Sequence, residues 1–139
     1  MELSISWLAV VVATAIGAAI AWVWYSDWGL VGGVWRVLTG VTKEASRRGG
    51  KSPFVVLLAS ILVTALALAA ACSMASGFFG SDSLWLDLGV GFASWIGFSF
   101  TTLVQHNAFE QKPTRLTVIN SAYQLVLFLG MALAVGLLQ

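Results

Sequence analysis

The chain has 139 residues, of which 59% are hydrophobic and only 9% are charged, and its mean hydropathy is +0.91. Soluble domains carry about 25% charged residues, so this composition excludes an ordinary water-soluble domain. The net charge is only +1, and the basic residues are not set among aromatic side chains on a sheet or helix, so we expect no nucleic-acid partner.

Four apolar runs are long enough to cross a bilayer as helices, which requires about 20 residues each. The first run contains no charge and has Trp7 at one end and Trp24 at the other, at the depth where aromatic rings favour the membrane interface. We therefore expect one all-α domain over residues 1–139. It should be an integral membrane four-helix bundle with helices at about residues 5–25, 53–76, 84–105 and 114–138.

The longest polar stretch, residues 26–52, separates the first two runs. Its first half is too apolar for a free loop and predicts a short amphipathic helix from about Val34. We expect that helix to lie in the membrane interface, with Trp35 and Leu38 toward lipid and Arg36 toward water. The second half is interpreted as a basic connector.

All seven basic side chains lie in the two segments that follow the first and third runs. The turn between the second and third runs contains no Lys or Arg. The positive-inside rule therefore predicts cytoplasmic basic loops, with both termini and this turn outside. We expect a multi-pass protein of the inner (plasma) membrane. The basic residues are Arg36, Lys43, Arg47, Arg48, Lys51, Lys112 and Arg115.

Asp82 and Asp87 flank the start of the third helix. Acidic side chains at this position complement the positive end of the helix dipole. With Ser81, Asp82 or Ser83 as the N-cap, this explains both acids without a functional role.

Polar residues are concentrated near the cytoplasmic ends of the third and fourth helices. Asn120 and Gln124 share one helix face, and amides are costly in hydrocarbon unless they are paired. The simpler interpretation is hydrogen bonding across the hairpin, with Asn120 buried against the third helix; the alternative is a small polar vestibule. The predicted cluster consists of Thr102, Gln105, His106, Asn120, Tyr123 and Gln124.

Small residues recur at four-residue spacing on the third helix, at Gly89, Ala93 and Gly97. Such a groove lets two backbones approach closely within a membrane. We expect it to form the closest helix–helix contact, either with the first helix through Ala13 and Gly17 or with a second protomer.

His106 and Glu110 lie four residues apart, but no further ligand or partner acid is expected at their depth. Cys72, the only cysteine, lies toward the opposite side of the membrane. We expect Glu110 to pair with Lys112 or Arg115 and His106 to be solvated. Metal sites, cofactors and catalytic residues are not expected, and we do not predict an enzyme.

A set of short motifs resembles the bacterial membrane family catalogued as domain of unknown function 1761, from about residue 7 to residue 136. The resemblance implies a small four-helix membrane protein without an assigned activity. Members often carry His where this chain has Gln124, so a proton-transfer role at that position would be lost. The motifs are Trp24-Tyr25, Trp35, Leu38-Thr39-Gly40, Trp95-x-Gly97-Phe98, Phe109-Glu110-x-Lys112-Pro113 and Ile119-Asn120-x-x-Tyr123-Gln124.

The sequence is compatible with three classes of function. The first is a structural or partner-binding protein of the lipid bilayer, acting as a homo-oligomer or with another membrane protein. The second is an oligomeric transporter or channel for a small molecule or ion, and the third is an intramembrane enzyme. Transport would require a polar stripe through the membrane, whereas the polar residues gather at the inner end, which favours the first class.

Overall fold

The computed structural model describes residues 3–139, and no strand occurs within this part of the chain. The elements are α1 (Trp7–Tyr25), α2 (Gly32–Thr39), α3 (Lys43–Arg48), α4 (Ser52–Phe79), α5 (Leu84–Ser94), the π-helix η1 (Trp95–Phe100), α6 (Thr101–Phe109) and α7 (Thr114–Leu138). Four helices are long and apolar enough to cross a membrane: α1, α4, the continuous α5–η1–α6 and α7. The predicted all-α membrane bundle is confirmed.

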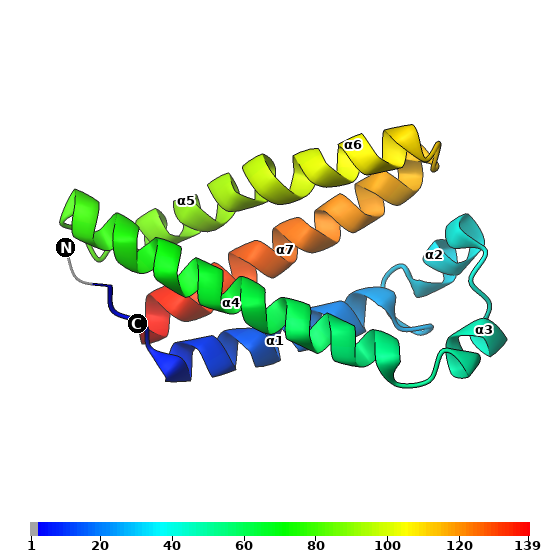
Figure 1. Ribbon diagram of the computed structural model, residues 1–139, viewed down its shortest axis with the longest axis horizontal. Coiled ribbons are helices and arrows are strands. Elements are labelled where there is room, and N and C mark those ends of the chain that lie inside the picture. Colours follow the sequence, from blue (N-terminus) through cyan, green and yellow to red (C-terminus); the bar gives the residue numbers. More distant parts are fainter. Residues whose placement is uncertain (1–2) are drawn as a thin grey trace.

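The two basic loops lie at the same end of the molecule (Figure 1). This end, which we call the basic end, contains residues 26–51 and 110–113. The opposite, acidic end contains residues 3–6, the turn between α4 and α5, and Gln139 (Figure 1). Helix α7 packs against α1, α4 and α5, whereas the backbones of α1 and α5 do not approach each other closely.

The middle of the bundle is closed by tightly packed apolar residues. A Cβ added to Gly17 of α1 would lie 2.7 Å from Ile61 Cγ2, and it would also contact Leu127 and Met131. Small residues at such crossings let the backbones approach closely. We call Gly17, Ile61, Leu127 and Met131 the apolar layer, because they separate the polar groups at the two ends.

The first helix does not occupy the groove that was predicted on the third helix. Gly89, Ala93 and Gly97 are exposed, and a Cβ on either glycine would have no neighbour within 4 Å. Gly91 makes the close approach instead, since a Cβ there would lie 2.8 Å from Ala132 Cβ and 3.1 Å from the Phe128 carbonyl oxygen. The predicted contact with α1 is therefore wrong, and contact with a second protomer stays a prediction.

The π-helical segment of the third helix redirects the residues that follow it. A π-helical turn holds more residues than an α-helical turn, so it rotates the next helix about its axis. Asn107 is consequently buried, while Gln105 and His106 are exposed. The side chain of Trp95 donates a hydrogen bond to the Ser121 carbonyl oxygen at 3.0 Å, which joins this segment to α7.

The loop at the basic end contains two helices rather than one. The predicted amphipathic helix is present as α2, but Trp35 packs edge-on against Tyr25, with ring centroids 5.9 Å apart, rather than pointing toward lipid. The segment interpreted as a connector includes α3, where the Thr42 hydroxyl caps the helix by accepting from the Ala45 amide at 3.0 Å. Arg36 does not simply face water, because it pairs with Asp27.

Candidate functional site

The predicted polar cluster does not form a single site. Thr102, Gln105 and His106 are exposed, and the Thr102 hydroxyl donates to the Phe98 carbonyl of its own helix at 2.7 Å. Gln124 is half-buried on α7. The rotation after η1 explains why the residues from the third helix turn away from α7.

Asn120 and Tyr123 belong instead to an aromatic cluster between α7 and α1. The Tyr25 hydroxyl donates to Asn120 Oδ1 at 2.5 Å, and the rings of Tyr25 and Tyr123 meet edge-on at 4.9 Å. Tyr123 also lies 6.4 Å from Trp24, between ring centroids. The prediction that Asn120 packs against the third helix is therefore wrong.

The third and fourth helices are nevertheless joined by a side-chain hydrogen bond near their connecting loop. Asn107 Nδ2 donates to Thr117 Oγ1 at 2.9 Å. The predicted pairing of Glu110 with Lys112 is confirmed at 3.4 Å, on the surface. Within residues 3–139, no three His, Cys, Asp or Glu side chains come together as a metal site.

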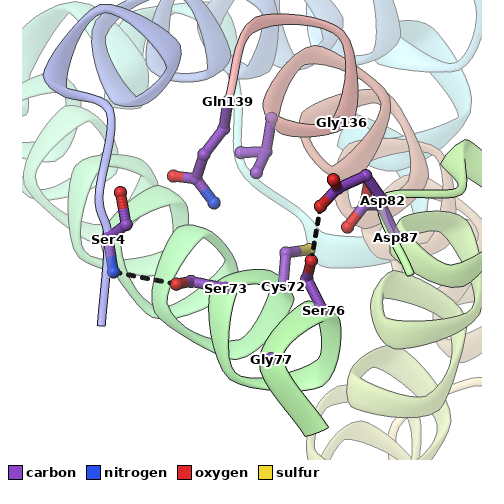
Figure 2. Close-up of a pocket in the computed structure, with 10 residues that line it drawn as sticks. Ser4, Cys72, Ser73, Ser76, Gly77, Asp82, Asp87, Gly136 and Gln139 are labelled. Atoms are coloured by element: carbon purple, nitrogen blue, oxygen red, sulfur yellow. Dashed lines mark hydrogen bonds between the residues drawn. The ribbon is translucent and has the colours of Figure 1, made fainter. Parts of the chain in front are cut away.

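The best-formed candidate site is a polar cavity of about 270 Å³ at the acidic end. Figure 2 shows its lining, which comes from α4, α5, α7 and the segments beside them. The ten lining residues are Ser4, Cys72, Ser73, Ser76, Gly77, Asp82, Asp87, Val135, Gly136 and Gln139.

Helix α4 supplies one wall of the cavity, with Cys72 and Ser76 spaced four residues apart and therefore on the same helix face. The Ser76 hydroxyl donates to Asp82 Oδ1 at 2.6 Å (Figure 2). The N-cap of α5 is Ser83, whose hydroxyl accepts from the Trp85 amide at 3.2 Å. The predicted N-cap is confirmed for Ser83, and Asp87 lies in the first turn of α5, where an acidic side chain complements the helix dipole.

Asp87 projects into the bundle from α5, and only 9% of its surface is exposed. Its carboxylate faces Gly136 of α7, where an added Cβ would lie 2.8 Å from Asp87 Oδ2. Asp87 forms no ion pair with any described residue. The lining of the cavity holds two carboxylates and no Lys, Arg or His, so its electrostatic potential favours a cation.

Backbone and amide hydrogen bonds close the side of the cavity near the two ends of the described chain. The Ser4 amide donates to Ser73 Oγ at 2.9 Å (Figure 2). Gln139 accepts from the Ser6 amide through Oε1 at 3.0 Å and donates through Nε2 to the Ala69 carbonyl at 3.0 Å. Gln139 thus links the segment before α1 to α4.

Sequence reasoning did not assign this cavity. A signal was present, because Asp87 lies inside an apolar run while Cys72 and Ser76 share one face of another. Capping and the helix dipole offered a sufficient explanation for the acid. The sequence does not show that these two faces meet beside Gly136.

A family model described as "Protein of unknown function (DUF1761)" matches residues 8–136, which is nearly the whole chain. The chain belongs to this family. In this DUF1761 member, five of the residues that carried the resemblance lie together at the basic end: Trp24, Tyr25, Trp35, Asn120 and Tyr123. Searches of curated proteins and of solved structures found no match.

Proposed function

We propose that this DUF1761 membrane protein binds a small positively charged solute, such as a primary amine, in the cavity at the acidic end. The observation that supports the proposal is the buried carboxyl group of Asp87, which has no cationic partner among residues 3–139. Ionisable residues within membrane helices are costly and commonly mark ligand or ion sites. A bound ammonium group would supply the missing partner.

The size and lining of the cavity fit a small polar solute. A water molecule takes up about 30 Å³ of liquid volume, so about 270 Å³ holds considerably more than one water. Ser73, Ser76 and Gln139 add neutral hydrogen-bonding groups. The proposed activity is binding without chemical conversion, because the only histidine, His106, lies toward the other end and the titratable groups of the lining are two carboxylates and the Cys72 thiol.

The apolar layer bears on whether the solute could cross the membrane. Gly17, Ile61, Leu127 and Met131 fill the middle of the bundle, so no polar path leads from the cavity toward the basic end in the described structure. A channel would require such a path. We therefore favour a binding site that opens at one end, and transport would require this layer to separate.

Binding can be tested with the purified protein in lipid nanodiscs. Calorimetry would compare small primary amines with alcohols and carboxylates of the same length. Asp87→Asn removes the charge with little change in size, and Glu110→Gln is the matched control at the basic end. Because hydrogen bonds to charged groups contribute about 1.5–3 kcal/mol, Asp87→Asn should weaken amine binding roughly 10- to 100-fold.

Two results would contradict the binding proposal. One is equal affinity for amines and alcohols, and the other is amine binding that survives Asp87→Asn unchanged. Either would indicate that Asp87 is a structural residue, such as a protonated carboxyl group hydrogen-bonded within the bundle.

We also propose that the acidic end faces the outside of the cell and the basic end the cytoplasm, in the inner (plasma) membrane. Support comes from the positive-inside rule together with the position of both basic loops at one end of the molecule (Figure 1). In this orientation the cavity would take its solute from outside.

A second candidate function is association with another helix, either in a homo-oligomer or in a complex with another membrane protein. The observation in its favour is that Gly89, Ala93 and Gly97 face outward, with open space beside both glycines. Small residues at this spacing suit helix packing in lipid. The two proposals are compatible, because the groove and the cavity lie on different faces of the third helix.

A further inference from the structure

A second cavity, of about 310 Å³, lies at the basic end, and its lining comes from the segment after α1, from α2 and α3, and from the start of α4. Its lining includes Asp27, Arg36, Lys43, Ser46, Arg47 and Phe54. Three of these residues are basic and one is acidic. The cavity is separate from the proposed amine site, which lies at the other end of the bundle.

Arg36 holds the walls of this cavity together. It pairs with Asp27 through Nε, and its Nη1 donates to the Val41 carbonyl at 3.2 Å and to Ser46 Oγ at 2.8 Å. The guanidinium group therefore joins the segment after α1 to α2 and α3. The ion pair between Arg36 and Asp27 largely neutralises both charges.

The first part of this loop, up to α2, is docked on the bundle. Trp35 packs against Tyr25, and Gly32 lies so close to the Ser26 carbonyl that a Cβ at this position would collide with it. Helix α2 also contacts α1 and α7. Helix α3, which carries Lys43 and Arg47, is joined to α2 through the hydrogen bond from Arg36 to Ser46.

Lys43 and Arg47 supply the cations that remain free. They lie four residues apart on α3, so they share one helix face, and both line the cavity. Neither forms an ion pair with any of residues 3–139. Two unpaired cations around a cavity suit a phosphate group, whose oxygens accept several charge-assisted hydrogen bonds.

We propose that this cavity binds the phosphate group of an anionic phospholipid. Phe54 lies in the lining of the cavity and is 64% exposed. Phe54 lies in the first turn of the spanning helix α4 and offers a surface for an acyl chain beside the cations. A phospholipid presents both chemistries, whereas free phosphate uses only the charged part of the site, so we favour the lipid as the source of the phosphate.

The proposal can be tested by native mass spectrometry of the detergent-solubilised full chain. Phosphatidylglycerol would be compared with phosphatidylcholine, and inorganic phosphate would be added as a competitor. The test variant is Lys43→Ala/Arg47→Ala. The matched control is Lys112→Ala/Arg115→Ala, which removes the same charge from the other basic loop.

We expect phosphatidylglycerol to remain bound in preference to phosphatidylcholine. Since each basic residue near a membrane surface adds about fivefold to anionic-lipid affinity, the test variant should bind roughly 25-fold more weakly. The control variant should bind like the wild type. Lys43→Arg/Arg47→Lys should retain binding, which separates loss of charge from loss of fold.

Three outcomes would overturn the proposal. Equal retention of the two lipids would contradict the predicted preference for an anionic lipid. Equal loss of phosphatidylglycerol binding in both alanine variants would indicate a general effect of charge. Displacement of phosphatidylglycerol by millimolar inorganic phosphate would assign the site to a soluble phosphate. None of these results depends on whether the cavity at the acidic end binds an amine.

Discussion

Gly136 of α7 leaves the space that the Asp87 carboxylate of α5 occupies, because a Cβ at position 136 would lie 2.8 Å from Asp87 Oδ2 and 3.3 Å from Asp87 Cβ. Both contacts are tighter than ordinary van der Waals packing. The position of the buried acid therefore depends on a glycine on the opposite helix. This relationship gives a test of the cavity that does not alter its charge.

Gly136→Ala should displace the Asp87 carboxylate from its present position. Overpacking of this kind costs about 1–3 kcal/mol of folding stability. Amine affinity should fall together with stability if the proposed function is correct. Gly89→Ala is the control, because a Cβ at that position meets nothing within 4 Å. Equal unfolding midpoints and amine affinities in both variants would contradict the described geometry.

The hydrogen bond between Tyr25 and Asn120 should contribute measurably to the packing of α1 on α7. Interhelical hydrogen bonds in membranes contribute about 0.6 kcal/mol on average, so Asn120→Leu should destabilise only modestly. A double-mutant cycle of Tyr25→Phe and Asn120→Leu, followed by unfolding in detergent, measures the coupling energy. Tyr123→Phe with Asn120→Leu is the comparison cycle, and equal coupling in the two cycles would argue against the assigned pair.

The two faces of α5 should respond differently to added volume. Gly91→Ala should destabilise the fold by about 1–3 kcal/mol, because the new methyl group meets Ala132 and the Phe128 carbonyl. Ala93→Leu lies on the exposed face and should leave the protomer's stability within about 0.5 kcal/mol. Thermal unfolding would distinguish these cases.

Ala93→Leu should also reduce the mass of the detergent-solubilised particle if the outward groove is a subunit interface. Ala67→Leu, at another exposed position, is the matched control. Unchanged mass in both variants would contradict the proposal that the protein forms a homo-oligomer through this groove. Lower stability at constant mass would show that Ala93 packs within the protomer.

The proposed topology can be tested by labelling single cysteines in intact cells, on a Cys72→Ser background. A cysteine at position 82 should react with a membrane-impermeant reagent from outside. A cysteine at position 47 should react only after the membrane has been permeabilised. Labelling of position 47 from outside would reverse the assignment.

The ion pair between Asp27 and Arg36 should give a defined pH dependence. The hydrogen bond from Arg36, aided by the charges of Arg36 and Lys43, holds the pKa of Asp27 below its ordinary value. The contact therefore stabilises the loop at pH values above about 3.9, the pKa of an unperturbed Asp, and this contribution is lost as the pH falls through the lowered pKa.

Arg36→Gln should raise the pKa of Asp27 toward its ordinary value, measured by carboxyl carbon NMR in detergent. Arg48→Gln is the control, since Arg48 is not among the residues that shift this pKa. An Asp27 pKa that stays low in Arg36→Gln would assign the shift to another cation.

Several properties of this protein follow from the sequence because they depend on local composition. Apolar length predicts the four spans, Pro53 is compatible with the first turn of α4, and the positions of Lys and Arg predict that both basic loops belong at one end. These features need no knowledge of which helices touch.

The tertiary structure decides how each helix is rotated, and hence which residues meet. Small residues occur on more than one face of α5, and packing against α7 selects Gly91 together with the face that carries Asp87. The π-helical segment, which hydropathy does not reveal, then turns Gln105 and His106 outward. Helix rotation reflects the summed packing of all neighbouring helices, so the cavity beside Asp87 and the contact between Tyr25 and Asn120 exist only in the assembled bundle.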